Sequence, residues 1–156
     1  MTRCATDNRP DLIRRLDEAV DRIVPSVTDL VRQLAPGEPS FRLDGEVRAL
    51  AAPLRFPDAI GHGVLVARVF RYRTAVRVDV EIQHDRMLAT STGGPTSRHC
   101  FLNDFVASVM LPPDVAALPE EFARGVLTGV RAAVNAVEAH NRHHRAPWSQ
   151  IRVVAS

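Results

Sequence analysis

The chain has 156 residues, 46% hydrophobic and 24% charged, which is typical of a globular domain and excludes a chain disordered throughout. This length predicts a single domain over 10–156, preceded by a loose polar N-terminus over 1–9. All 20 basic residues are arginines, and the net charge of +2 excludes a polyanion binder that works through overall charge alone. The lysine-free composition, rich in Ala, Val, Pro and Arg, indicates a GC-rich bacterial gene.

Cysteine content and hydropathy indicate the compartment. The two cysteines, Cys4 and Cys100, make no disulfide framework and no Cys-x-x-Cys site, so reduced thiols are the simplest interpretation. The first ten residues, MTRCATDNRP, lack the apolar region of a secretion signal, and no window approaches a membrane span. We therefore expect a cytoplasmic protein with no membrane partner.

The first predicted element is a long helix over 11–34. Its apolar residues recur every three or four positions, as on one helix face: Leu12, Leu16, Val20, Ile23, Val27, Leu30 and Leu34. Pro25 lies inside this pattern and should kink or split the helix near Val24.

A hairpin is predicted next, over 41–56. Asp44-Gly45 is the strongest turn dipeptide of the chain. Pro53 and Pro57 then end regular structure, so we expect a loop over 53–63.

Residues 64–83 give the strongest strand signal, because the even-numbered positions are mostly apolar and the later odd-numbered ones mostly polar. A two-residue hairpin loop at Arg73-Thr74 would place Phe70 on the same face as Arg77 and break this alternation. A three-residue loop over 73–75 would keep it, but such loops favour a glycine that is absent here. We therefore favour one long, bent strand, with the three-residue hairpin as the alternative.

The second half of the chain predicts two more strands, a helix and a last strand. A turn at His84-Asp85 should lead into a short return strand, and a polar loop over 91–98 precedes a strand over 99–111. In that strand one face should carry Phe101, Phe105, Ala107, Val109 and Leu111. A helix over 119–144 should bury Phe122, Val126, Val130, Val134 and Val137, and residues 148–155 suit a final strand.

Together these elements predict an α+β fold. One antiparallel sheet of 4–6 strands, with a long bent central strand, should pack against two long helices over 11–34 and 119–144. Gly125, Gly129 and Ala133 recur every four residues and indicate close packing of the second helix, against the sheet or in a homodimer. The order helix–strands–helix also occurs in small dimeric secretion chaperones and nucleoid-associated proteins, a likeness of element order only.

The stretch EAHNRHHRAP, residues 138–147, is the densest group of titratable side chains. His140 and His144 are one helical turn apart and could share a metal, but Asn141 stands where a zinc peptidase has its general base. Arg142, His143 and Arg145 suit a phosphate-type anion better, and basic residues at a helix C-terminus also complement its dipole. We therefore expect no metal and no cofactor.

A second candidate surface consists of arginines on the long predicted strand. Arg71, Arg73 and Arg77 fall on its polar face with acidic neighbours, so they form either a solvated face with ion pairs or a partner-binding surface. Arg68 interrupts the apolar positions, which indicates a buried carboxylate partner or the edge of a pocket.

A third candidate is a pocket with nucleophilic and polar groups. Besides Arg68, it would use His84 of the predicted turn and four residues of the strand over 99–111, namely His99, Cys100, Asn103 and Asp104.

The leading functional hypothesis is a homodimeric, non-enzymatic binding or adaptor protein of chaperone or regulatory type. Its arginine-rich sheet face would bind an acidic protein segment or another anion, because the sequence contains no complete catalytic or metal motif. The alternatives are a small-molecule or enzymatic pocket and a dimer that binds nucleic acid, for which a continuous basic stripe is required.

Overall fold

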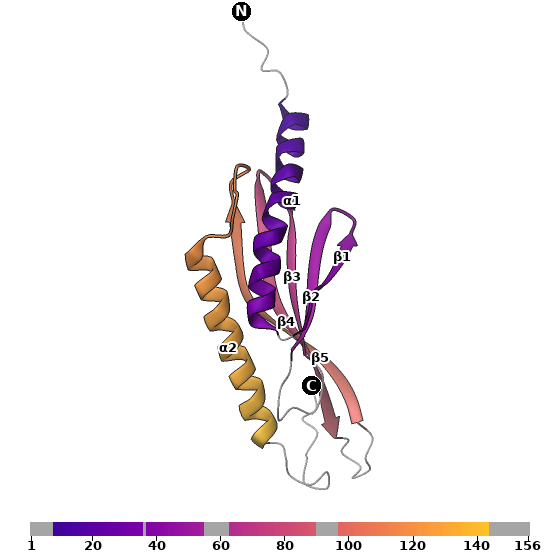
Figure 1. Ribbon diagram of the computed structural model, residues 1–156. Helices are drawn as coiled ribbons and strands as arrows, with labels where there is room; N and C mark the ends of the chain where they lie inside the picture. Colours follow the sequence, from indigo (N-terminus) through magenta and orange to yellow (C-terminus); the bar gives the residue numbers. More distant parts are fainter. Residues whose placement is uncertain (1–7, 36, 55–62, 90–96, 144–156) are drawn as a thin grey trace, which may run out of the picture.

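The computed structural model describes residues 8–35, 37–54, 63–89 and 97–143, with side chains throughout except over 84–89, 97–105 and 137–143. The elements follow in the order α1 (Arg9–Leu34), β1 (Ser40–Asp44), β2 (Val47–Leu54), β3 (Gly63–Tyr72), β4 (Ala75–Ala89), β5 (Ser97–Leu111) and α2 (Glu120–His143). The strands form one antiparallel five-stranded sheet in chain order (Figure 1). The predicted α+β class is confirmed, and both long helices lie where the apolar periodicity placed them.

Helix α1 is amphipathic and continuous. The predicted apolar stripe is buried at its centre and half-buried at its ends, Leu12 and Leu34. Pro25 lies inside the helix and is exposed, so the prediction that it splits the helix is wrong. Neither described helix is long and apolar enough to cross a membrane.

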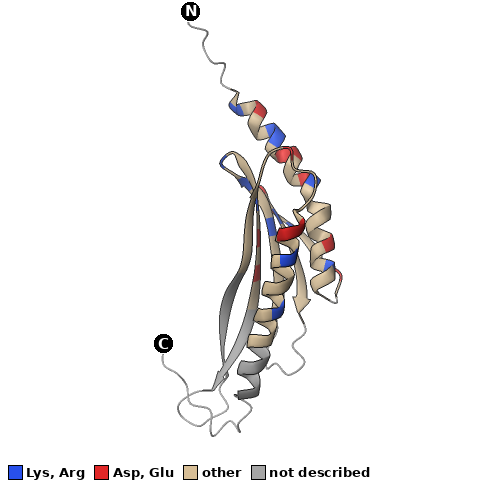
Figure 2. Cartoon of the chain, turned by 90° about the vertical axis from the view of Figure 1, so that its left-hand side faces the viewer, with Lys and Arg blue, Asp and Glu red and all other residues tan. Residues whose placement is uncertain are grey.

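Both helices cover the same face of the sheet, as Figure 2 shows from the side. Helix α1 packs mainly on β3 and β2, whereas α2 packs mainly on β5. The buried core between the layers includes Leu16, Ile23 and Val27 of α1, Leu65 and Val69 of β3, Val78, Val80 and Ile82 of β4, and Val126 of α2.

The predicted first hairpin is confirmed, with its loop shifted by one residue. Asp44 pairs with Val47, so the loop is Gly45-Glu46, and Gly45 has a φ of 60° that suits glycine. The predicted loop over 53–63 was too wide, because Pro53 still belongs to β2 and Gly63 already begins β3. Residues 55–62 lie outside the described residues.

The prediction of one long bent strand over 64–83 is wrong, and so is the alternative of a three-residue hairpin loop. Tyr72 pairs with Ala75, which leaves Arg73-Thr74 as a two-residue loop between β3 and β4. Arg73 itself adopts the left-handed conformation, with a φ of 57°, that the prediction reserved for glycine. The apolar phase therefore does break at this loop, and Phe70 is the register partner of Arg77.

Strand β4 continues past the predicted turn at His84-Asp85 to Ala89, so that turn is also wrong. The β4–β5 ladder contains a β-bulge. Ala107 pairs with Val80 and Phe105 pairs with Glu81, which leaves Val106 as the extra residue and interrupts the predicted alternation of β5. The predicted last strand over 148–155 lies outside the described residues.

Candidate protein-binding face

The face of the sheet away from both helices, here called the outer face, carries charged and aromatic side chains. The register identifies the residues of this face. The core residues of β3 and β4 pair largely with one another and point toward the helices, so the residues between them in each strand point to the outer face. Among the described side chains, β3, β4 and β5 contribute Val64, Val66, Arg68, Phe70, Tyr72, Arg77, Asp79, Glu81, Gln83, Ser108 and Met110.

Opposite charges are matched across the middle of the outer face. Arg68, which interrupts the apolar pattern of the sequence, forms an ion pair with Glu81. Arg77 Nε donates a hydrogen bond to Asp79 Oδ1 at 2.8 Å, and Ser108 Oγ donates to the same oxygen at 2.6 Å. Hydrogen bonding to Asp79 raises the pKa of the Arg77 guanidinium above its ordinary value, so Arg77 remains charged at any pH near neutrality.

Two guanidinium groups lie against one aromatic ring at the β3–β4 end of this face. The guanidinium carbons of Arg73 and Arg77 are 5.3 Å and 5.1 Å from the centre of the Tyr72 ring. Phe70 packs edge-on against Tyr72 at 6.5 Å, and Met110, the register partner of Arg77, is 54% exposed beside them. We call these five residues the Tyr72 cluster.

Arg71 lies on the helix side of the sheet, apart from Arg73 and Arg77. Its Nη2 is 2.5 Å from Glu46 Oε1 of the β1–β2 loop, and its Nε is 2.6 Å from Asp17 Oδ1 of α1. The Nε contact is not aligned as a hydrogen bond, so it acts as an ion pair only. Of the three arginines that the sequence grouped, the structure brings two together and uses the third to join α1 to the sheet.

The other predicted sites lie largely outside the described side chains. In the backbone register His84 pairs with Leu102, and Cys100 and His99 pair with Arg86 and Met87, so the proposed pocket residues do fall on neighbouring strands. Their side chains are not described, apart from that of Arg68, which pairs with Glu81 instead. The nucleophilic pocket therefore stays a prediction.

The histidine-rich stretch also stays a prediction. Arg142 and His143 are the last residues of α2, and His144 and Arg145 lie outside the described residues. Within the described ranges, no three His, Cys, Asp or Glu residues converge as metal ligands.

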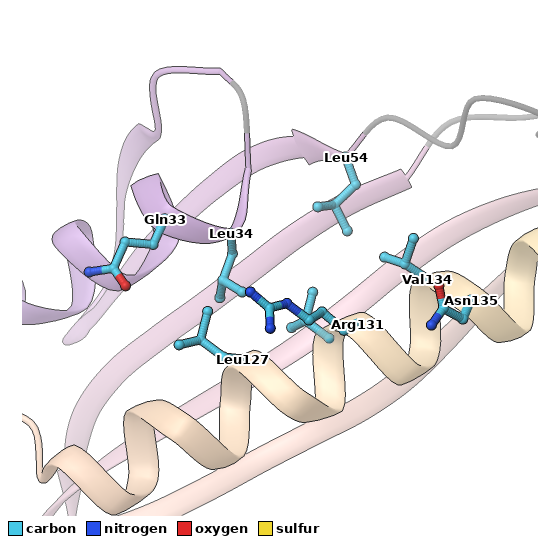
Figure 3. A pocket seen from close by; sticks show the side chains of 8 residues that line it. Gln33, Leu34, Leu54, Leu127, Arg131, Val134 and Asn135 are labelled. Atoms are coloured by element: carbon cyan, nitrogen blue, oxygen red, sulfur yellow. The ribbon is translucent and has the colours of Figure 1, made fainter.

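The sequence did not predict a pocket of about 370 Å³ between the two helices and the end of β2 (Figure 3). Its lining residues are Gln33 and Leu34 of α1, Leu54 of β2, and Leu127, Val130, Arg131, Val134 and Asn135 of α2. Figure 3 shows the Arg131 side chain reaching across the pocket toward Leu34. Three elements that are far apart in sequence line this pocket. In the sequence, the local indication of such a pocket is Arg131, which lies beside the apolar stripe of α2.

Charges of both signs are interleaved over the described surface, as along α1 in Figure 2. Arg14, for example, lies between Asp11 and Glu18 and forms ion pairs with both. The same matching recurs at Arg32, Arg48, Arg68, Arg71 and Arg77. Comparisons of the chain with protein-family models, with curated proteins and with solved structures found no match.

Proposed function

We propose that this is a non-enzymatic binding protein of adaptor type, whose Tyr72 cluster docks an acidic segment of a partner protein. The observation that carries the proposal is the placement of two arginines against the half-buried ring of Tyr72. Arg77 is already paired with Asp79, whereas among the described residues no carboxylate forms an ion pair with Arg73. A partner's carboxylate would therefore pair with Arg73, whose guanidinium can donate two parallel hydrogen bonds to it.

The composition of the cluster supports a protein partner rather than a free anion. Tyrosine, phenylalanine, methionine and arginine are the residue types enriched in protein interfaces, and Tyr and Arg dominate their binding energy. Phe70, Tyr72 and exposed Met110 provide apolar contact area next to the two cations. A segment that alternates acidic and apolar side chains would match both features.

The backbone of Arg73 adds a second argument. A non-glycine residue with a φ of 57° is held in a conformation that costs it free energy, and such strain is concentrated at functional positions. An arginine at this tip of the hairpin is therefore consistent with a functional role of its side chain.

The test uses fluorescence anisotropy with a labelled peptide of alternating acidic and apolar residues, and with its counterpart in which amides replace the carboxylates. We expect Arg73→Glu to weaken binding of the acidic peptide by about tenfold, and Tyr72→Ala to weaken it as well. Arg124→Glu is the matched control, because it makes the same charge change at an exposed position of α2. Equal losses for Arg73→Glu and Arg124→Glu, or equal binding of the two peptides, would contradict the proposal.

The pocket of Figure 3 supports a second candidate function, the binding of a small apolar carboxylate. Its volume lies within the range of small-molecule sites, and five of its eight lining residues are aliphatic. The polar ones are Gln33, Asn135 and Arg131, and Arg131 is positioned to meet an anionic head group. Octanoate and octanol are suitable probes for calorimetry. We expect Arg131→Gln to weaken octanoate binding and to leave octanol binding unchanged, while Arg124→Gln changes neither. Failure of wild-type protein to bind either probe would exclude this function.

A further inference from the structure

Strand β1 is an edge strand that lies outside the layer covered by the helices. Among the described strands it pairs with β2 alone, and α1 packs on β2, β3 and β4 but makes no substantial contact with β1. All five residues of β1 are exposed. Figure 1 shows the strand at the edge of the sheet beside β2. Along its other side, the backbone N–H and C=O groups of β1 have no partner strand within the described part of the chain and are therefore available to another strand.

Two large apolar side chains project from this strand. Phe41 and Leu43 are 56% and 57% exposed. They lie on the helix side of the sheet, because their register partners are Leu50, which is buried in the core, and Arg48, which pairs with Asp21 of α1. Two such side chains contribute no stability while β1 is exposed to water. If a partner covers β1, burial of both side chains stabilises the association.

The charges on the other side of β1 identify the partner. Arg42 and Asp44 alternate with the apolar pair and so project from the outer face. When a second β1 is laid antiparallel about a twofold axis at Leu43, Arg42 of each copy faces Asp44 of the other, and Leu43 faces its own counterpart. A twofold axis at Arg42 would instead set two arginines against each other.

We propose that two copies of this chain associate through their β1 strands in this register, with the twofold axis at Leu43. The two sheets then form one continuous sheet, and both helix layers lie on the same side of it because the axis is perpendicular to the sheet. Phe41 and Leu43 of both copies gather on that side, and two Arg42–Asp44 pairs form on the outer face. The interface is isologous, as a twofold dimer requires.

Sedimentation velocity over a wide range of protein concentration tests this arrangement on variants in which the charges of Arg42 and Asp44 are reversed. Arg42→Asp and Asp44→Arg should each raise the dimer dissociation constant by at least about tenfold, since each sets like charges face to face. The double variant Arg42→Asp/Asp44→Arg should dimerise like wild type. An equimolar mixture of the two single variants should form a heterodimer, because one then presents two acidic residues to the two arginines of the other.

Two further variants separate this edge from any other interface. Leu43→Lys should abolish the dimer with both charge pairs intact, whereas Met110→Lys, at an equally exposed apolar position of β5, should leave it unchanged. Circular dichroism of each variant checks that the fold is retained. A wild-type protein that stays monomeric at every concentration would overturn the proposal. So would single charge variants that dimerise as wild type does, or a mixture that forms no heterodimer.

Discussion

Gly129 of α2 lies directly against Val106, the bulge residue of β5. A Cβ atom at position 129 would be 2.7 Å from Val106 Cγ1, a distance that non-bonded carbon atoms do not tolerate. The bulge and the glycine thus belong to one contact, which sets how closely α2 approaches the sheet. The glycine spacing of the sequence indicated close packing, and at this position it is confirmed.

Replacing this glycine should destabilise the fold, whereas replacing its neighbour one turn earlier should not. We expect Gly129→Ala to lower the free energy of unfolding by about 1–3 kcal/mol through overpacking. Nothing lies within 4 Å of a Cβ at Gly125, so Gly125→Ala should raise it by about 0.5–1 kcal/mol through helix propensity. Urea denaturation measures both. Effects of the same sign would show that the Val106 contact does not control α2 packing.

Asp79 on the outer face should contribute to the stability of the fold. It is only 15% exposed and accepts hydrogen bonds from both Arg77 and Ser108. Asp79→Asn removes the charge that strengthens both bonds and should lower the urea midpoint. Asp29→Asn, at a 70% exposed position 3.6 Å from Arg32, should leave it unchanged.

The Asp79 effect should be constant from neutral to mildly alkaline pH. The pKa of Arg77 is raised in the folded protein, so its contribution is fully present below its unfolded pKa and is lost only in strong alkali. Urea midpoints of wild type and Asp79→Asn at several pH values in this window check this. A difference that disappears before strong alkali would contradict the assignment.

Arg73 should lower the stability of the protein and at the same time contribute to partner binding. Arg73→Gly relieves a left-handed backbone and should stabilise the protein by about 0.5–1 kcal/mol, while it removes the cation that the proposed acidic segment needs. Thr74→Gly is the control, because Thr74 does not have a positive φ and glycine there only adds unfolded-state entropy. Thermal melts and peptide anisotropy on the same samples measure both properties. Stabilisation by Thr74→Gly and not by Arg73→Gly would be the contrary result.

Pro25 should be a destabilising residue inside α1. It cannot donate the helical hydrogen bond to the Asp21 carbonyl, and its exposure means that the ring contributes little packing. Pro25→Ala should therefore raise the free energy of unfolding by at least about 1 kcal/mol. Pro10→Ala should have almost no effect, because a proline in the first turn lacks only an N–H that has no partner within the helix.

The arginine-rich strand shows how a local pattern misleads when a turn is unusual. The alternation over 64–83 predicted one continuous phase, because a two-residue loop at Arg73-Thr74 would break it and a three-residue loop would lack its favoured glycine. The chain accepts that strain at Arg73, so the phase breaks and Arg71 and Arg77 fall on opposite faces of the sheet. Arg68, which looked like an exception, is instead an ordinary outer-face residue paired with Glu81.

The sequence by itself determined the two helices, the glycine turn at Gly45 and the α+β class, because periodicity and turn chemistry are local properties of the chain. Only the tertiary structure decided where the sheet reverses, which carboxylate each arginine meets and where α1, β2 and α2 enclose a pocket. These features depend on contacts between segments far apart in sequence, whose geometry no local pattern encodes. The Tyr72 cluster belongs to both, since four of its residues lie close together in sequence over 70–77, whereas Met110 joins them only through the pairing of β4 with β5.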